Sequence, residues 1–153
     1  MATHISRSPE ATLALGEQWG RAAQRGWVIG LSGDLGAGKT QFVRGFARGL
    51  GCPARVHSPT FALLNEYGGG RLRLFHLDLY RLNNGDEVAG AGLEEYLIQP
   101  DGVAGVEWIE RWLPAEFEVQ SSKFKVQSSD VRLVRIETLS ETERQFTYED
   151  SGA

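Results

Sequence analysis

The sequence contains a single cysteine, Cys52, among its 153 residues. An intrachain disulfide is therefore impossible, and the lack of a cysteine or cysteine–histidine cluster argues against structural zinc. We expect Cys52 to be a small packing residue. Asparagine is also scarce, with three residues, none of them followed by lysine. The N-K-x-D motif that reads guanine is therefore missing.

Long apolar runs and an excess of basic residues are absent as well. No stretch approaches the roughly 18 apolar residues that a membrane span requires, and the N-terminal MATHISRSPE lacks the apolar core of a signal peptide. We therefore expect a cytoplasmic protein with no membrane contact. The net charge of −4 is unlike that of a domain that grips nucleic acid unaided, so any RNA contact should be local or shared with a partner.

Apolar spacing and turn residues predict one small α/β domain over residues 1–153, a mixed sheet with helices on both faces. The predicted helices cover 9–25, 39–50 and about 92–97, and Asn83-Asn84-Gly85 is predicted as a turn. The predicted strands cover 27–32, 60–67, 71–79, 102–106, 116–126, 131–138 and 144–149. The tetrapeptide VQSS occurs at 119–122 and again at 126–129. We interpret 115–130 as a surface hairpin that tolerates a local duplication.

Residues 33–40 read GDLGAGKT, which fits the phosphate-loop pattern G-x-x-x-x-G-K-[ST]. An apolar run precedes the motif and an amphipathic helix follows it, as a phosphate loop requires. Its glycines allow successive backbone N–H groups to point into one concavity, and the helix dipole adds to that field. The predicted nucleotide-binding residues here are Asp34, Leu35, Gly36, Ala37, Gly38, Lys39, Thr40 and Gln41. Lys39 should reach the β- and γ-phosphates and Thr40 should ligate magnesium. No D-x-x-G follows the loop, so ATP is favoured over GTP.

A phosphate loop works with a carboxylate that supports magnesium and a polar group that orients the attacking water. Asp78 and Glu107 each end an apolar run that is predicted to be a buried strand. Both are candidate catalytic residues, together with Lys39, and both are candidate metal ligands, together with Thr40. The residue pattern leaves open which carboxylate ligates metal and which activates water, and it also allows either one to be a solvated strand end.

Thr60 lies where a loop enters a predicted strand, in the segment HSPTF. Its hydroxyl or backbone amide could sense the γ-phosphate as a switch loop does. A capping turn made by Ser58 and fixed by Pro59 explains the same residues equally well.

Aromatic and basic residues add weaker candidates. His76 alternates with Asp78 on one strand and is interpreted as a core histidine. Trp108 and Trp112 share a face if they lie on a helix, where they would pack in the core, although Trp108 could instead stack on a base. The arginine pairs and triads that could meet RNA or an acidic partner, and are otherwise solvated faces, are Arg44 with Arg48 and Arg71 with Arg73 and Arg81.

Four motifs in order, GDLGAGKT, SPTF, HLDLYRL and VEWIER, resemble the TsaE family over residues from about 8 to 114. The resemblance implies a small P-loop ATPase needed to make threonylcarbamoyladenosine in tRNA. It also implies work with TsaB and with TsaD, the transferase, while a separate TsaC-type enzyme makes the donor.

Carried onto this sequence, the resemblance implies that Lys39 and Thr40 bind phosphates and magnesium. It also implies a switch-like segment, a metal-associated aspartate and a catalytically important pair, which are respectively Ser58 to Thr60, Asp78, and Glu107 with Trp108. Many members have a second hydroxyl residue where this chain has Gln41, so an α-phosphate contact there would rely on the backbone N–H. The duplicated VQSS is not a feature of the family.

Our hypothesis from the sequence is that ATP hydrolysis cycles a TsaB–TsaD-type complex, with tRNA met indirectly or through local arginine patches. Two alternatives belong to other classes. The first is a small-molecule P-loop kinase, which would need phosphate-facing arginines in a lid, where the C-terminal third offers scattered Arg132, Arg135 and Arg144. The second is a nucleotide-dependent binding module without catalysis.

Overall fold

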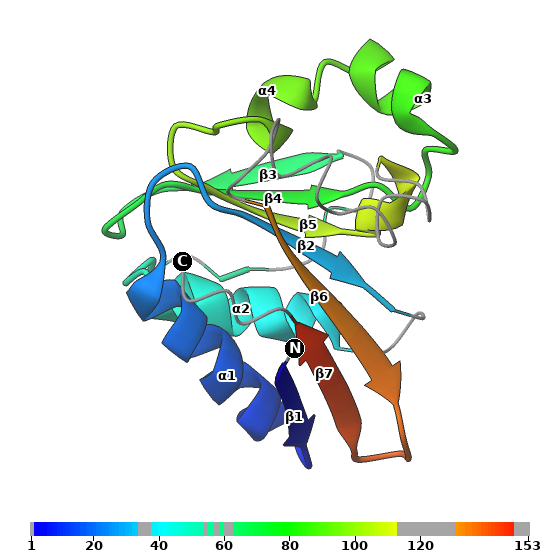
Figure 1. The fold of residues 1–153 in the computed structure, drawn as a ribbon. Helices are drawn as coiled ribbons and strands as arrows, with labels where there is room; N and C mark the ends of the chain where they lie inside the picture. The colour runs from blue at the N-terminus through cyan, green and yellow to red at the C-terminus, as the bar shows by residue number, and fades with distance from the viewer. Residues whose placement is uncertain are drawn as a thin grey trace.

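A seven-stranded mixed sheet forms the centre of the computed structural model, which describes residues 2–33, 38–53, 55–56, 59, 63–112 and 131–148 (Figure 1). The strand order is β1-β7-β6-β2-β5-β4-β3. The strands are β1 (Ala2–Ser6), β2 (Val28–Ser32), β3 (Leu64–Tyr67), β4 (Leu74–Asp78), β5 (Val103–Glu107), β6 (Val131–Thr138) and β7 (Arg144–Tyr148). The helices are α1 (Pro9–Ala22), α2 (Lys39–Gly49), α3 (Gly85–Gly90), α4 (Glu94–Leu97) and the 3₁₀ turn η1 (Ile109–Arg111).

Four central strands, β6, β2, β5 and β4, run parallel, so their carboxyl ends meet at one edge of the sheet. β1, β7 and β3 pair antiparallel with their neighbours. Glu107 at the end of β5 is in register with Leu31 of β2 on one side and with Asp78 of β4 on the other. The parallel register thus places Glu107 beside the strand that leads into the glycine loop, and Asp78 one strand further away.

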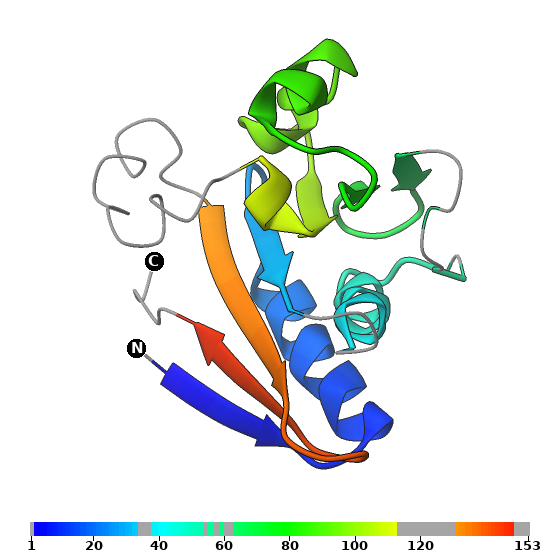
Figure 2. The ribbon, with the colours of Figure 1, turned by 90° about the vertical axis from the view of Figure 1, so that its right-hand side faces the viewer.

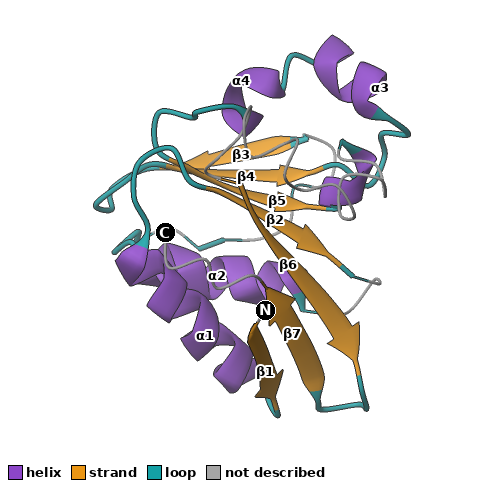
Figure 3. Ribbon diagram, in the orientation of Figure 1, coloured by secondary structure: helices purple, strands orange, loops and turns teal. Residues whose placement is uncertain are grey.

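Helices cover both faces of the sheet, with α1 and α2 on one face and α3 and α4 on the other (Figure 3). β2 is buried along its whole length because its side chains alternate between two cores. Ile29 and Leu31 contribute to the core that contains α1 and α2, and Val28 contributes to the core that contains α3, α4 and η1. The predicted α/β architecture with helices on both faces is confirmed.

The helices α1 and α2 cross backbone to backbone, and glycine makes this approach possible. Gly16 and Gly20 of α1 face Gly45 and Gly49 of α2, and in each case an added Cβ would overlap a backbone carbonyl oxygen of the opposite helix. Figure 2 shows the two helices side by side against the sheet. The position of α2, whose first turn carries Lys39 and Thr40, is therefore set by the backbone of α1.

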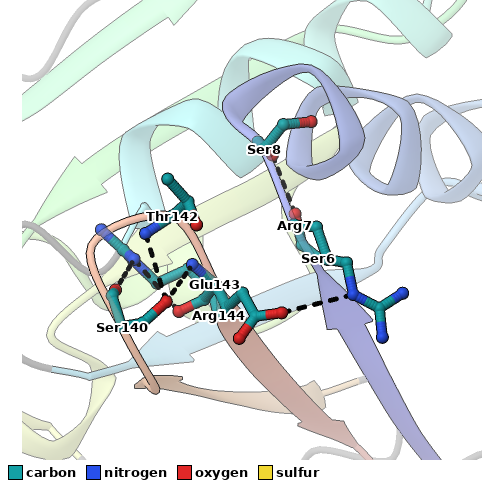
Figure 4. A network of polar contacts seen from close by, with 7 residues as sticks. All are labelled: Ser6, Arg7, Ser8, Ser140, Thr142, Glu143 and Arg144. Atoms are coloured by element: carbon teal, nitrogen blue, oxygen red, sulfur yellow. Dashed lines mark hydrogen bonds and ion pairs between the residues drawn. The ribbon is translucent and has the colours of Figure 1, made fainter.

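The sequence-based prediction missed β1, which begins the described chain and pairs with β7 near the other end. The segment after β1 is tied to the turn between β6 and β7 (Figure 4). Arg7 Nε donates to Glu143 Oε2 at 3.3 Å, and Ser6 Oγ donates to the Ser8 carbonyl at 2.9 Å. Ser8 then caps α1 by accepting from the Ala11 amide, as predicted.

Two further element predictions need correction. The first helix ends at Ala22, three residues before the predicted Arg25. The predicted turn at Asn83-Asn84-Gly85 is the start of α3, because the Asn84 side chain accepts from the Glu87 amide and caps a helix there. The predicted strand 116–126, the hairpin 115–130 and the VQSS repeats lie outside the described residues. Within the described part of the chain, no helix is long and apolar enough to cross a membrane.

Candidate nucleotide-binding site

The described ends of the glycine loop lie between β2 and α2, as the motif requires. Gly38 has φ +102°, a left-handed conformation that favours glycine, and α2 begins at Lys39. The Lys39 side chain is buried, at 4% exposure, and its Nζ donates to the Gly33 carbonyl at 2.6 Å. This hydrogen bond thus joins the first residue of the motif to the lysine near its end. Asp34, Leu35, Gly36 and Ala37 lie outside the described residues.

Three elements bring their side chains together at Glu107. Thr40 Oγ1 of α2 donates to Glu107 Oε2 at 2.9 Å, and His76 Nε2 of β4 lies 2.6 Å from the same oxygen. His76 is 0% exposed and Glu107 is 4% exposed. Because an ionised carboxylate only accepts, His76 Nε2 is assigned as the donor. The prediction of a core histidine is right about burial, but it missed that His76 bonds directly to a site carboxylate.

Asp78 ends β4 beside Glu107 and is partly exposed. Its Oδ1 accepts from the Tyr80 amide at 3.0 Å. The described residues contain no group of three or more histidine, cysteine, aspartate and glutamate side chains arranged to hold a metal. Two carboxylates with the Thr40 hydroxyl nevertheless match the hard oxygen donors of a magnesium ion that completes its shell with water and substrate phosphates.

Trp108 follows Glu107 directly and contacts Lys39. It has φ +61°, and its ring centroid lies 4.4 Å from Lys39 Nζ. Tyr80 lies 4.9 Å from the Trp108 ring, and the Arg111 guanidinium lies 5.5 Å from it. The left-handed backbone turns the chain sharply after Glu107 and directs the indole over the lysine. The sequence pattern did not single out Tyr80 or Arg111, because contacts across a turn leave no periodic signal.

The two tryptophans do not share an α-helical face, which corrects that expectation. Trp108 precedes and Trp112 follows the 3₁₀ turn η1, and both pack partly buried on the core beneath it. The turn lies close on β2, since a Cβ on Gly30 would come within 2.7 Å of Ile109. Gly30 therefore allows η1 to pack directly on β2, and this packing fixes the position of Trp108 at the start of η1.

The remaining candidates divide between structural contacts and undescribed residues. Gln41 Nε2 donates to the Pro9 carbonyl at 3.1 Å, so its side chain braces α1. Several predicted patch arginines also have local partners: Arg44 with the Val56 carbonyl, Arg71 with the Gly20 carbonyl and Arg73 with Glu66. Ser58 and Thr60 lie outside the described residues.

The topology, the lysine at the start of α2 and the carboxylate beside β2 define a P-loop NTPase-like α/β protein. The profile described as "Threonylcarbamoyl adenosine biosynthesis protein TsaE" matches residues 6–144. The chain therefore belongs to the TsaE family, as the motif resemblance predicted.

Individual relatives agree with this assignment. The curated tRNA threonylcarbamoyladenosine biosynthesis protein TsaE of Bacillus subtilis (strain 168) is 47% identical over 71% of this chain and 69% of that protein. The protein of the same name from Nostoc sp. is 49% identical over 67% of this chain and 64% of that protein. The Aquifex aeolicus protein of that name is 36% identical over 86% of this chain and 94% of its own length. The crystal structure of Bacillus subtilis YdiB superposes with a TM-score of 0.68 at 30% identity, over 96% of this chain and 83% of that one.

Proposed function

We propose that this protein is a magnesium-dependent ATPase of tRNA threonylcarbamoyladenosine biosynthesis, and that hydrolysis cycles a TsaB–TsaD-type transferase complex. The observation that carries the proposal is the bond from Thr40, one residue after the buried Lys39, to the Glu107 carboxylate. A lysine and a hydroxyl at a helix start, joined to a strand-end carboxylate, are the parts that phosphoryl transfer from a nucleotide uses. The family name supplies the pathway.

The site geometry suggests separate roles for the two carboxylates. Thr40 and Glu107 are already hydrogen-bonded, so we assign these two to the magnesium shell. Asp78 lies one strand further from β2, so we assign it to a supporting ligand or to orientation of water. Bound magnesium would neutralise charge that develops on the phosphoryl oxygens.

Lys39 and Trp108 would bind the nucleotide itself. The Lys39 ammonium is held by a carbonyl and an aromatic face, both of which phosphate oxygens can replace as partners. Trp108 offers a ring for stacking on adenine. The loop residues Asp34 to Gly38, the Gln41 amide and Thr60 complete the proposed nucleotide site.

Contact with tRNA is proposed to be indirect. Arg44, Arg71 and Arg73 each donate to groups of this chain, which favours structural roles for them over a preformed RNA surface. The net charge of −4 points the same way. We therefore place recognition of tRNA with the partner complex, in the cytoplasm.

Steady-state phosphate release tests this proposal. ATP and magnesium are supplied to the protein alone and then with a purified TsaB–TsaD complex and tRNA. We expect a low basal rate that the complex raises. Glu107→Ala should lower phosphate release by at least about 100-fold while leaving the ATP affinity measured without magnesium within about threefold, because a positioned catalytic group acts mainly in the transition state. Glu94→Ala, an exposed carboxylate on α4, is the matched control and should leave both unchanged.

Three contrary outcomes would each refute a different part of the proposal. Full hydrolysis by Glu107→Ala would remove Glu107 from the mechanism. A high rate indifferent to the complex, with phosphate transferred to an added metabolite, would show a small-molecule kinase. Many rounds of tRNA modification with a non-hydrolysable ATP analogue would show a binding module in which nucleotide only joins the partners.

A further inference from the structure

His76 is buried on the α2 side of the sheet, yet within the described part of the chain it is hydrogen-bonded through only one of its two ring nitrogens. Nε2 lies 2.6 Å from Glu107 Oε2, whereas Nδ1 is buried and has no hydrogen-bond partner among the described residues. A histidine kept for core structure alone would normally have both nitrogens satisfied or would be replaced by an apolar residue. The hydrogen bond from His76 to Glu107 is therefore the feature that a functional role would explain.

Both hydrogen bonds to the Glu107 carboxylate arrive at the same oxygen. Oε2 accepts from Thr40 Oγ1 and from His76 Nε2, and no hydrogen bond from the described part of the chain reaches Oε1. Because both donors bond to Oε2, they fix the orientation of the carboxylate about the Cγ–Cδ bond of Glu107. Oε1 is the oxygen left for chemistry.

We propose that His76 is a positioning residue that holds Oε2 and thereby presents Oε1 of Glu107 to the magnesium and water of the reaction. This inference rests on the ATPase function proposed above. Thr40 and His76 are not equivalent supports. The Thr40 hydroxyl is itself an expected magnesium ligand, whereas His76 is a rigid ring on β4, the strand paired with β5. His76 therefore anchors the carboxylate whether or not nucleotide is bound.

Two amide replacements separate positioning from packing. The Nε2 of glutamine can reach about where the histidine Nε2 lies, while the shorter asparagine places its amide near the unpartnered Nδ1. Both substitutions leave a polar, smaller side chain in the same buried place. His76→Gln should therefore keep the bond to Glu107, and His76→Asn should lose it.

The test measures turnover and binding for both variants beside the wild type. We expect His76→Asn to lower kcat by roughly 10- to 100-fold, and to cut the gain in ADP affinity on adding magnesium by about tenfold in titration calorimetry, while the ADP affinity without magnesium stays unchanged. His76→Gln should stay within about threefold of wild type in both. Equal losses in the two variants, or none in His76→Asn, would overturn the inference.

A double-mutant cycle checks that His76 acts through Glu107. In a Glu107→Ala background, His76→Asn should have no further effect on the magnesium-dependent ADP affinity. A second loss of the same size would assign His76 a separate role and overturn the proposal. If His76→Asn does not fold, His76→Gln decides alone, because a tenfold loss there contradicts the proposal and retention supports it.

Crystal structures of the nucleotide-free variants separate this inference from the proposed function. The Glu107 carboxylate should rotate in His76→Asn and keep its orientation in His76→Gln. A wild type without ATP hydrolysis would refute the ATPase proposal, and the carboxylate orientation would still decide the role of His76. An unchanged carboxylate in His76→Asn would refute that role.

Discussion

Gly45→Ala is expected to destabilise the protein by about 3 kcal/mol or more, at the upper end of what overpacking costs. The new Cβ would overlap the Leu13 carbonyl oxygen and come within 3.1 Å of the Glu17 amide nitrogen, both backbone atoms of α1. A backbone cannot move aside as a flexible side chain can, so the two helices must separate. The gain in helix propensity from glycine to alanine, about 1 kcal/mol, offsets only part of this cost.

Urea unfolding followed by circular dichroism measures the effect. Gly90→Ala is the matched control, because Gly90 is helical in α3 and nothing lies within 4 Å of its Cβ position. The control should be neutral or stabilised by up to about 1 kcal/mol. Unfolding of Gly45→Ala within about 1 kcal/mol of wild type would show that the α1–α2 crossing adjusts and does not fix α2.

The second large effect is expected for Lys39→Ala, which should weaken ATP binding by at least about 100-fold, because charge-assisted bonds to phosphate oxygens are among the strongest available. The variant should remain folded, because it removes a buried ammonium that is costly to desolvate. Loss of affinity with an intact fold therefore identifies a direct contact.

Calorimetric titration with ATP and magnesium provides the measurement, and urea unfolding provides the check on folding. Arg48→Ala is the control, since Arg48 is an exposed cation in the last turn of the same helix. Its ATP affinity should stay within about twofold of wild type, because an exposed charge about two and a half turns from Lys39 is largely screened. If Lys39→Ala bound ATP with wild-type affinity, the phosphates of ATP would not contact Lys39.

The local parts of the site could be predicted because short segments encode them. The glycine loop, the start of α2 at Lys39 and the buried strand before it follow from one motif and the apolar residues around it. Asp78 and Glu107 were recognisable as acids that end apolar runs, but that they lie in register on neighbouring parallel strands emerged only from the structure. The likeness to TsaE arose from the same short motifs and is confirmed by the family match.

Features that depend on distant segments could not be predicted in this way. β1 was missed because its stability comes from pairing with β7, more than a hundred residues away. The position of Trp108 over Lys39 depends on the left-handed backbone of Trp108 and on Gly30, which lets η1 approach β2. No periodic pattern in the sequence signals either feature.

The sequence by itself determined the family, because the motifs that carry the family resemblance are short continuous segments. Only the tertiary structure decided how the side chains of the candidate site support one another. Thr40, His76 and Glu107 come from α2, β4 and β5, and their meeting at one carboxylate oxygen follows from the register of parallel strands and the seating of α2 on α1. Hydrogen bonds act over about 3 Å, so only the assembled fold can select such partners.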